Sequence, residues 1–193
     1  MKKHLLLSIL ALCFIGLSNS SAQGFVKPSE GKAAIYFTRT VTFGSGMLID
    51  IFDGEEYIAY SMGKGYSVYE CEPGNHVFWV AAENTDFITA DLEAGKVYIA
   101  QVYVYPGVMK GRISLVPNSA TDAKLDGYNA SLEIVKAESP KVMKEKTFEG
   151  RKAKFTKKKF MTVKMEGYKN NIEGKKEVPH ISKEMAVEAK EFK

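Results

Sequence analysis

Short apolar runs alternate with turn residues between positions 32 and 118, and this pattern predicts a β-rich domain. In the second run, Met47, Ile49 and Ile51 fall on one face by period-two alternation, and an Asp-Gly pair at 53–54 then favours a tight hairpin turn. Eight strands are expected, at 33–39, 47–52, 55–62, 66–71, 76–82, 85–92, 97–105 and 112–116. Because the loops between consecutive strands are too short for parallel crossovers, we expect an antiparallel β-sandwich of the immunoglobulin-like or prealbumin-like kind.

The pattern changes after Pro117. A helix is expected from about 121 to 136, although Gly127 weakens it. Residues 141–169 fit a second helix, but the alternation within 160–165 also suits a strand, and short apolar runs do not decide between the two. A last helix-like stretch follows at 182–192. We therefore expect a sandwich domain at 23–118 and a basic, mostly helical extension at 119–193.

Charge and aromatic content support that boundary. Residues 24–118 hold 7 Lys/Arg against 11 Asp/Glu, whereas residues 119–193 hold 18 against 12. Aromatic residues divide the other way, with 15 in the first stretch and 6 in the second. The sequence therefore combines an acidic, aromatic region with a basic one.

The first 22 residues have the three-part build of a secretory signal peptide. Lys2 and Lys3 precede an apolar run, and Ser20 and Ala22 supply the small side chains that signal peptidase needs. The run is roughly 13 residues long, whereas a membrane-spanning helix needs about 20. We expect cleavage after Ala22 and a periplasmic or secreted mature protein. Lipidation at Cys13 is the alternative, although the bulky residue before this cysteine disfavours it.

A family resemblance rests on three short motifs: Tyr36-Phe37 in the first strand, Pro73-Gly74 with His76, and Gly95-Lys96 with Tyr98. With these motifs, residues of about 32–118 resemble the bacterial domain family of unknown function numbered 2846. The resemblance implies an exported, sandwich-like domain, often in lipoproteins. It implies no activity and no catalytic residues.

Candidate catalytic chemistry is sparse. After signal cleavage Cys71 is the sole cysteine, so no internal disulfide is expected, and we interpret it as a small buried hydrophobe. His76 and His180 are far apart and lack the spacing of a metal site. We therefore expect no enzyme activity, no metal and no cofactor. A small hydrolase that uses Glu70, Glu72 or His76 is the alternative.

Carboxylates gather around the Asp-Gly hairpin, at Asp50, Asp53, Glu55 and Glu56. Their order lacks the alternating ligands of a calcium loop, so a solvated hairpin is expected.

Aromatic residues exceed what a small core needs, so some of them are expected at the surface. An exposed tyrosine row suits sugar stacking or a protein interface, although tyrosine is also ordinary in strands. The candidate surface comprises Tyr57, Tyr60, Tyr66, Tyr69 and Trp79. Its expected partner is an envelope protein or a glycan.

The basic extension offers a second candidate surface. Its densest cluster of cations comprises Arg151, Lys152, Lys154, Lys157, Lys158 and Lys159. Such a cluster can contact an anionic membrane surface, or it can dock on the acidic domain of the same chain. Glu145, Glu149 and Glu166 are interleaved and are expected to dilute its field. Nucleic acid is not an expected partner, because the chain is expected outside the cytoplasm and carries few interleaved aromatics.

Overall fold

The computed structural model describes residues 24–107, 111–122 and 125–192, so the expected signal peptide and Cys13 lie outside the described residues. All eight expected strands are present, with small shifts at their ends, and a short ninth strand follows near the C-terminus. The strands are β1 (Ala33–Arg39), β2 (Leu48–Asp53), β3 (Glu56–Met62), β4 (Gly65–Cys71), β5 (Gly74–Ala81), β6 (Thr85–Leu92), β7 (Val97–Pro106), β8 (Gly111–Asn118) and β9 (His180–Ile181).

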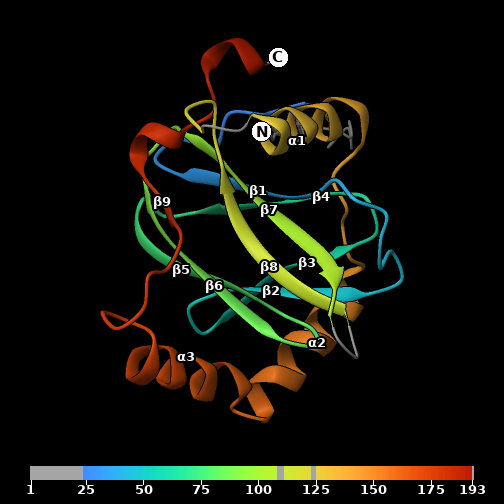
Figure 1. Ribbon diagram of the computed structural model, residues 1–193, viewed down its shortest axis with the longest axis vertical. Helices are drawn as coiled ribbons and strands as arrows, with labels where there is room; N and C mark the ends of the chain where they lie inside the picture. The colour runs from blue at the N-terminus through green and yellow to red at the C-terminus, as the bar shows by residue number, and fades with distance from the viewer. Residues whose placement is uncertain (1–23, 108–110, 123–124, 193) are drawn as a thin grey trace, which may run out of the picture.

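The strands form two sheets that face one another (Figure 1), in the orders β4-β1-β7-β8 and β3-β2-β5-β6-β9. The mainly β, sandwich-like expectation is confirmed, but a purely antiparallel arrangement is wrong. β1 pairs with β7 in parallel, and β6 pairs with β9 in parallel. The expectation considered only consecutive strands. Between β1 and β7 the chain passes through strands of both sheets, and this long excursion makes a parallel return possible.

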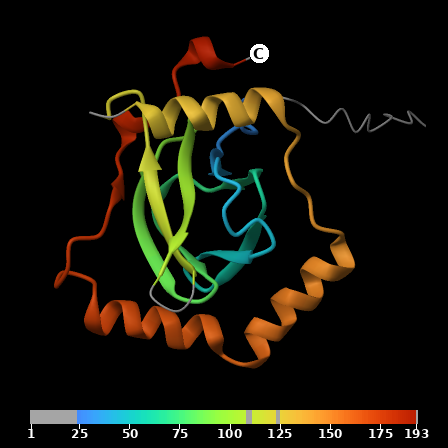
Figure 2. The same ribbon diagram turned by 45° about the vertical axis from the view of Figure 1, so that its right-hand side comes forward.

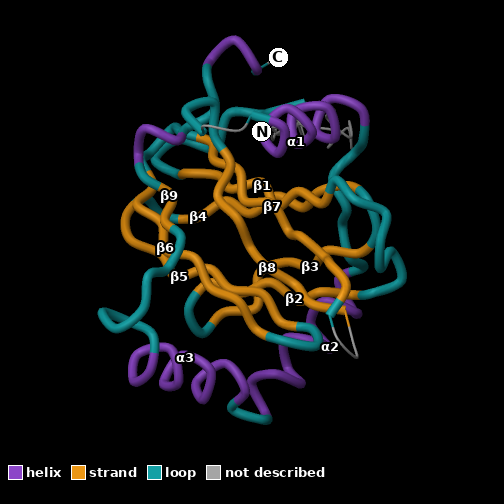
Figure 3. The backbone as a smooth tube through the Cα atoms, in the orientation of Figure 1, coloured by secondary structure: helices purple, strands orange, loops and turns teal. Residues whose placement is uncertain are grey.

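The core lies between the sheets, where alternate side chains of each strand meet. Ile49 and Ile51 of β2 face this core, and Met47 packs against it, as the alternation predicts. Phe37 of β1 meets Phe78 of β5 edge to face, with ring centroids 5.6 Å apart. Figure 3 shows the two layers of strands with the helices outside them.

Two side chains, one from β6 and one from the loop before it, connect β6 to the backbone of β8. The Asn84 side chain donates from Nδ2 to the Ile113 carbonyl and accepts from the Ile113 N–H at Oδ1, both at 2.8 Å. Asp86 Oδ2 accepts from the Leu115 N–H at 2.9 Å. These side chains satisfy backbone groups at the β8 edge that a further strand would otherwise pair with.

The extension forms three helices, α1 (Asp126–Ala137), α2 (Glu145–Lys157) and α3 (Phe160–Asn171), and two short 3₁₀ turns at Lys183–Met185 and Ala189–Glu191. Residues 160–165 are therefore helical rather than extended, and the single helix expected at 141–169 is divided at Lys158 and Lys159. The expected last helix is replaced by β9 and the 3₁₀ turns. Among the described helices, none has the length and apolar content to cross a membrane.

The helices cover the outer faces of both sheets (Figure 2). α1 packs on the four-stranded sheet, where Leu132 and Val135 meet Tyr36 and Ile99. α2 and α3 pack on the five-stranded sheet, where Phe155 and Met165 join its aromatic side chains.

Gly127 lets α1 approach a buried polar network on the sheet. Asn118 Nδ2 donates to Gln101 Oε1 at 2.6 Å and to Ser131 Oγ at 3.4 Å, and Ser131 Oγ lies 2.7 Å from Thr38 Oγ1. A Cβ at position 127 would lie 2.9 Å from Gln101 Oε1 and 3.1 Å from Asn118 Oδ1. The glycine that weakens the helix pattern is therefore required by close packing.

We predict that Gly127→Ala lowers the free energy of unfolding by about 1–3 kcal/mol, because the added methyl collides with hydrogen-bonded side chains that have little room to move. Gly150→Ala in α2 is the matched control: a Cβ there meets nothing within 4 Å, so greater helix propensity raises stability by about 0.5–1 kcal/mol. Urea unfolding of both variants measures the two effects. Equal stabilisation by both substitutions would contradict the packing role of Gly127.

Candidate functional site

The aromatic residues on the outer face of the five-stranded sheet form a stack. Phe52 lies over Trp79 with ring centroids 3.9 Å apart and planes at 11°, and Trp79 continues to Phe87 at 5.8 Å. Tyr57 meets Phe52 edge to face at 5.5 Å. Trp79 Nε1 donates to the Gly54 carbonyl at 2.8 Å. An exposed stack of this kind would be a binding platform.

The extension covers this stack. Phe155 of α2 meets Phe52 at 5.2 Å, and Tyr168 of α3 meets Phe87 at 5.0 Å. Tyr57 and Trp79 consequently have no exposed surface. The expected exposed aromatic surface is therefore wrong for these two residues, because apolar side chains of the extension replace solvent.

The other three candidate aromatics lie elsewhere. Tyr66 is buried beneath α1 and stacks on Tyr36 at 5.6 Å, and burial raises its pKa to about 12. Tyr69 is half-buried against the inner core, edge to face with Phe78 at 6.5 Å. Tyr60 is half-buried and lines a cavity of about 160 Å³ with Phe148. The five residues do not share one surface.

Asp50, beside the acidic hairpin, is buried and anchors the extension. Asp50 on β2 receives two hydrogen bonds from Arg151 on α2, from Nε at 2.8 Å and from Nη2 at 2.6 Å. These bonds raise the pKa of the Arg151 guanidinium, because they stabilise its charged form. The geometry is the two-point fork that makes Arg–carboxylate pairs strong.

Further polar contacts reinforce this anchor. Lys152 Nζ lies 3.1 Å from Glu56 Oε1, and Thr162 Oγ1 donates to Glu55 Oε2 at 2.6 Å. The expected solvated hairpin is therefore wrong for Asp50, which is buried, whereas Glu55 and Glu56 are exposed. These carboxylates hold α2 and α3 against the sheet, as in the alternative in which basic residues dock on the acidic domain.

The predicted basic cluster thus divides into two parts. Arg151 and Lys152 face the sandwich and are paired, whereas the remaining four side chains are exposed. These four are Lys154, Lys157, Lys158 and Lys159, and they form no ion pair within the part of the chain that the structure describes.

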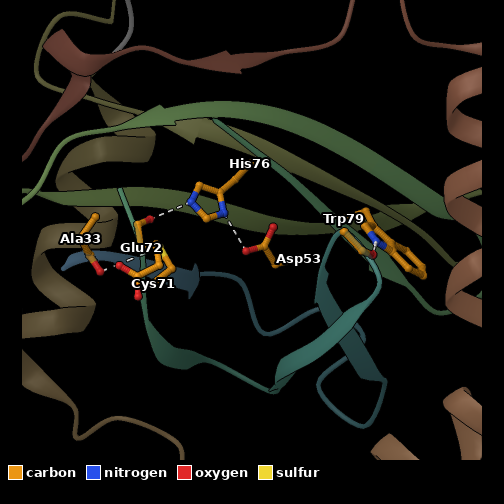
Figure 4. A network of polar contacts seen from close by, with 7 residues as sticks. Ala33, Asp53, Cys71, Glu72, His76 and Trp79 are labelled. Carbon is orange, nitrogen blue, oxygen red and sulfur yellow. Dashed lines mark hydrogen bonds and ion pairs between the residues drawn. The ribbon is translucent and has the colours of Figure 1, made fainter. Parts of the chain in front are cut away.

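A second polar group lies at the end of the β2–β3 hairpin (Figure 4). His76 Nδ1 lies 2.7 Å from Asp53 Oδ2, and His76 Nε2 lies 2.9 Å from the Glu72 carbonyl oxygen. The imidazole stacks on Phe78 with planes at 4°. The side chains of His76 and Asp53 are 12% and 15% exposed, so solvent screens this pair only weakly.

The protonation state of His76 follows from these contacts. The hydrogen bond to Asp53 is the main cause that raises the pKa of His76 to about 10, and the Cys71 thiol and the Glu72 carbonyl add to it, while burial opposes it. His76 is therefore charged at neutral pH and donates from both ring nitrogens. In this state it is a structural cation and not a general base.

The hydrolase candidates do not converge. Glu72 is exposed and forms an ion pair with Lys32, and Glu70 Oε1 accepts from the Ser29 N–H at 3.4 Å. Cys71 is buried, with its Sγ 3.9 Å from the Ala33 carbonyl oxygen. Within the described ranges, no three His, Cys, Asp or Glu side chains gather as a metal ion would need.

Sequence reasoning missed the pairing of His76 with Asp53. The two residues lie near turns at one end of β2 and β5, and these strands pair antiparallel with Asp53 opposite Phe78. β2 and β5 are not consecutive, so strand pattern alone did not reveal that they are neighbours.

Comparison with known proteins adds little. No family model matches the chain, and no curated protein matches it. Among solved structures, the N-terminal domain of AlgF from P. aeruginosa is similar over 47% of this chain and 100% of that domain, at 14% identity and a TM-score of 0.32. We infer nothing about fold or function from a likeness this weak.

We predict that His76→Gln lowers the free energy of unfolding by about 2 kcal/mol below pH 6.5, because a charge-assisted hydrogen bond is lost. The folded-state pKa of His76 is raised, so its contribution is complete below the unfolded pKa of 6.5 and disappears as the pH rises through about 10.

Urea unfolding of the wild type and of His76→Gln between pH 6 and pH 10 measures this difference. The exposed residue His180, substituted in the same way, serves as the control. If the loss of unfolding free energy caused by His76→Gln stays constant or grows with pH, the charged His76–Asp53 pair is contradicted.

Proposed function

We propose that the chain is an exported, non-catalytic module of the bacterial cell envelope, which binds or supports a partner and meets anionic surfaces through its C-terminal extension. The main support for this proposal is that the basic cluster divides into paired and exposed cations. Two of its cations hold the extension on the sandwich, whereas four are left for an external partner.

The covered sheets support a role for the extension as the contact surface. α1 lies on one outer face, and α2 and α3 lie on the other. A partner that approaches either of these faces therefore meets helices first. An envelope protein or a glycan remains a predicted partner, without a defined surface on the sandwich.

The non-catalytic assignment is supported by the use of the titratable groups. His76, Glu70 and Glu72 each hold a neighbouring segment, and the charged His76 cannot accept a proton at neutral pH. A small hydrolase has less support on these grounds. The immunoglobulin-like or prealbumin-like subclass, and membership of the domain family numbered 2846, stay predictions.

Fractionation of producing cells tests the proposal. We expect a mature chain that begins at Gln23 and sediments with envelopes at low salt, and we expect about 1 M salt to release it, because salt screens surface charges beyond roughly 3 Å at that strength. Mass spectrometry defines the N-terminus. A cytoplasmic protein that retains residues 1–22 would refute export, and a lipid adduct on Cys13 would replace soluble export by a lipoprotein anchor.

A further inference from the structure

We infer that the junction of α2 and α3 is a binding site for the phosphate groups of anionic lipid headgroups. The site, which we name the lysine corner, comprises Lys154, Lys157, Lys158 and Lys159. This inference deepens the proposed function and rests on it, since an exported chain meets such lipids at the envelope surface.

The backbone brings the four side chains together. Lys154, Lys157 and Lys158 are spaced three and four residues apart at the end of α2, so they share one helical face. Lys159 follows directly and begins the turn into α3. All four are exposed. Several ammonium groups on one convex corner suit a surface that presents many phosphates.

Acidic residues of α2 do not neutralise this corner. At 3.6 residues per turn, Glu145 and Glu149 lie more than about 100° around the helix axis from Lys154. Phe155 marks the buried face between them and Lys154, and Glu149 lies roughly 12 Å along the axis from Lys157. On α3, Glu166 lies seven residues from Lys159, which is roughly 10 Å along the axis and about one Debye length at 0.1 M salt. The expected dilution by interleaved glutamates is therefore weak at the corner.

Lys159 has an unfavourable backbone conformation. Its φ of 47° makes it the one non-glycine residue with positive φ in the described ranges. Glycine adopts this region without steric cost, whereas an L side chain is disfavoured there. A turn alone would be formed better by glycine. The turn therefore carries a charged side chain at a position where glycine would be free of strain.

An exposed apolar side chain lies beside the corner. Val163 is 60% exposed and lies in the first turn of α3, four residues after Lys159. Cations next to an exposed apolar residue are typical of segments that lie at a lipid–water interface.

Vesicle binding tests the inference with the protein as recovered from producing cells, so that all variants share one N-terminus. The probes are vesicles of phosphatidylcholine alone and vesicles that also contain phosphatidylglycerol. We expect binding only to the second kind. Each lysine near such a surface contributes about 1 kcal/mol, so Lys159→Gly should weaken partitioning about 5-fold and K157Q/K158Q/K159G about 100-fold.

Two controls separate charge from structure. Lys159→Arg keeps the charge and should bind as the wild type does. K27Q/K175Q/K176Q removes three exposed lysines elsewhere and should weaken binding less than about 5-fold, the effect of one lysine at the corner. Lys159→Gly should also keep or raise the melting temperature by a few degrees, because it relieves the positive φ. Weaker binding together with higher stability is a combination that a merely structural lysine would not give.

Four outcomes would overturn the inference. These are equal losses from the two triple variants, a fall in melting temperature with Lys159→Gly, no binding of the wild type to anionic vesicles, or release by inorganic phosphate beyond that by chloride at equal ionic strength. The last would indicate a site for soluble phosphate. Failure of the proposed function is distinguishable, because fractionation and the mature N-terminus decide export independently of vesicle binding.

Discussion

Burial of the aromatic face on the five-stranded sheet is the constraint on which the C-terminal half of this structure depends. Phe52, Tyr57, Trp79 and Phe87 lie on the outside of that sheet, away from the core between the sheets. Each such side chain has on the order of 200 Å² of surface to bury, and leaving it in water would cost about 25 cal/mol for each Å². α2 and α3 cover these side chains, so the extension is an integral part of the fold.

Polar contacts around the aromatic face set the position of that cover. Asp50 lies on the same face as the aromatic stack, and its two bonds to Arg151 fix α2 in both distance and direction. A buried carboxylate without this partner would be costly. The pairing also determines which cations remain outside, because Arg151 and Lys152 are turned inward and the lysine corner, one to two turns further along, is left in solvent.

Strand positions were predictable because alternation and turn residues are local signals, as Ile49, Ile51 and the Asp-Gly hairpin illustrate. The pairing of the strands was not predictable from the sequence, because the parallel contact of β1 with β7 joins segments about 60 residues apart. The exposure of Trp79 was not predictable because its cover includes Phe160, whose ring lies 5.9 Å away and which belongs to a distant segment with a weak apolar pattern. The six members of the basic cluster are evident from the sequence, but only three-dimensional contacts distinguish the paired Arg151 and Lys152 from the four exposed lysines.

Trp79 is the sole tryptophan of the chain, so its fluorescence reports directly on the cover provided by the extension. The measurement is iodide quenching of the folded, full-length protein, with the urea-unfolded protein as the reference. If α2 and α3 lie on the sheet as described, emission of the folded protein is blue-shifted and iodide scarcely quenches it, and both properties disappear on unfolding. Red-shifted emission that iodide quenches in the folded protein would show that the aromatic face is open, and would contradict the account of the extension as part of the fold.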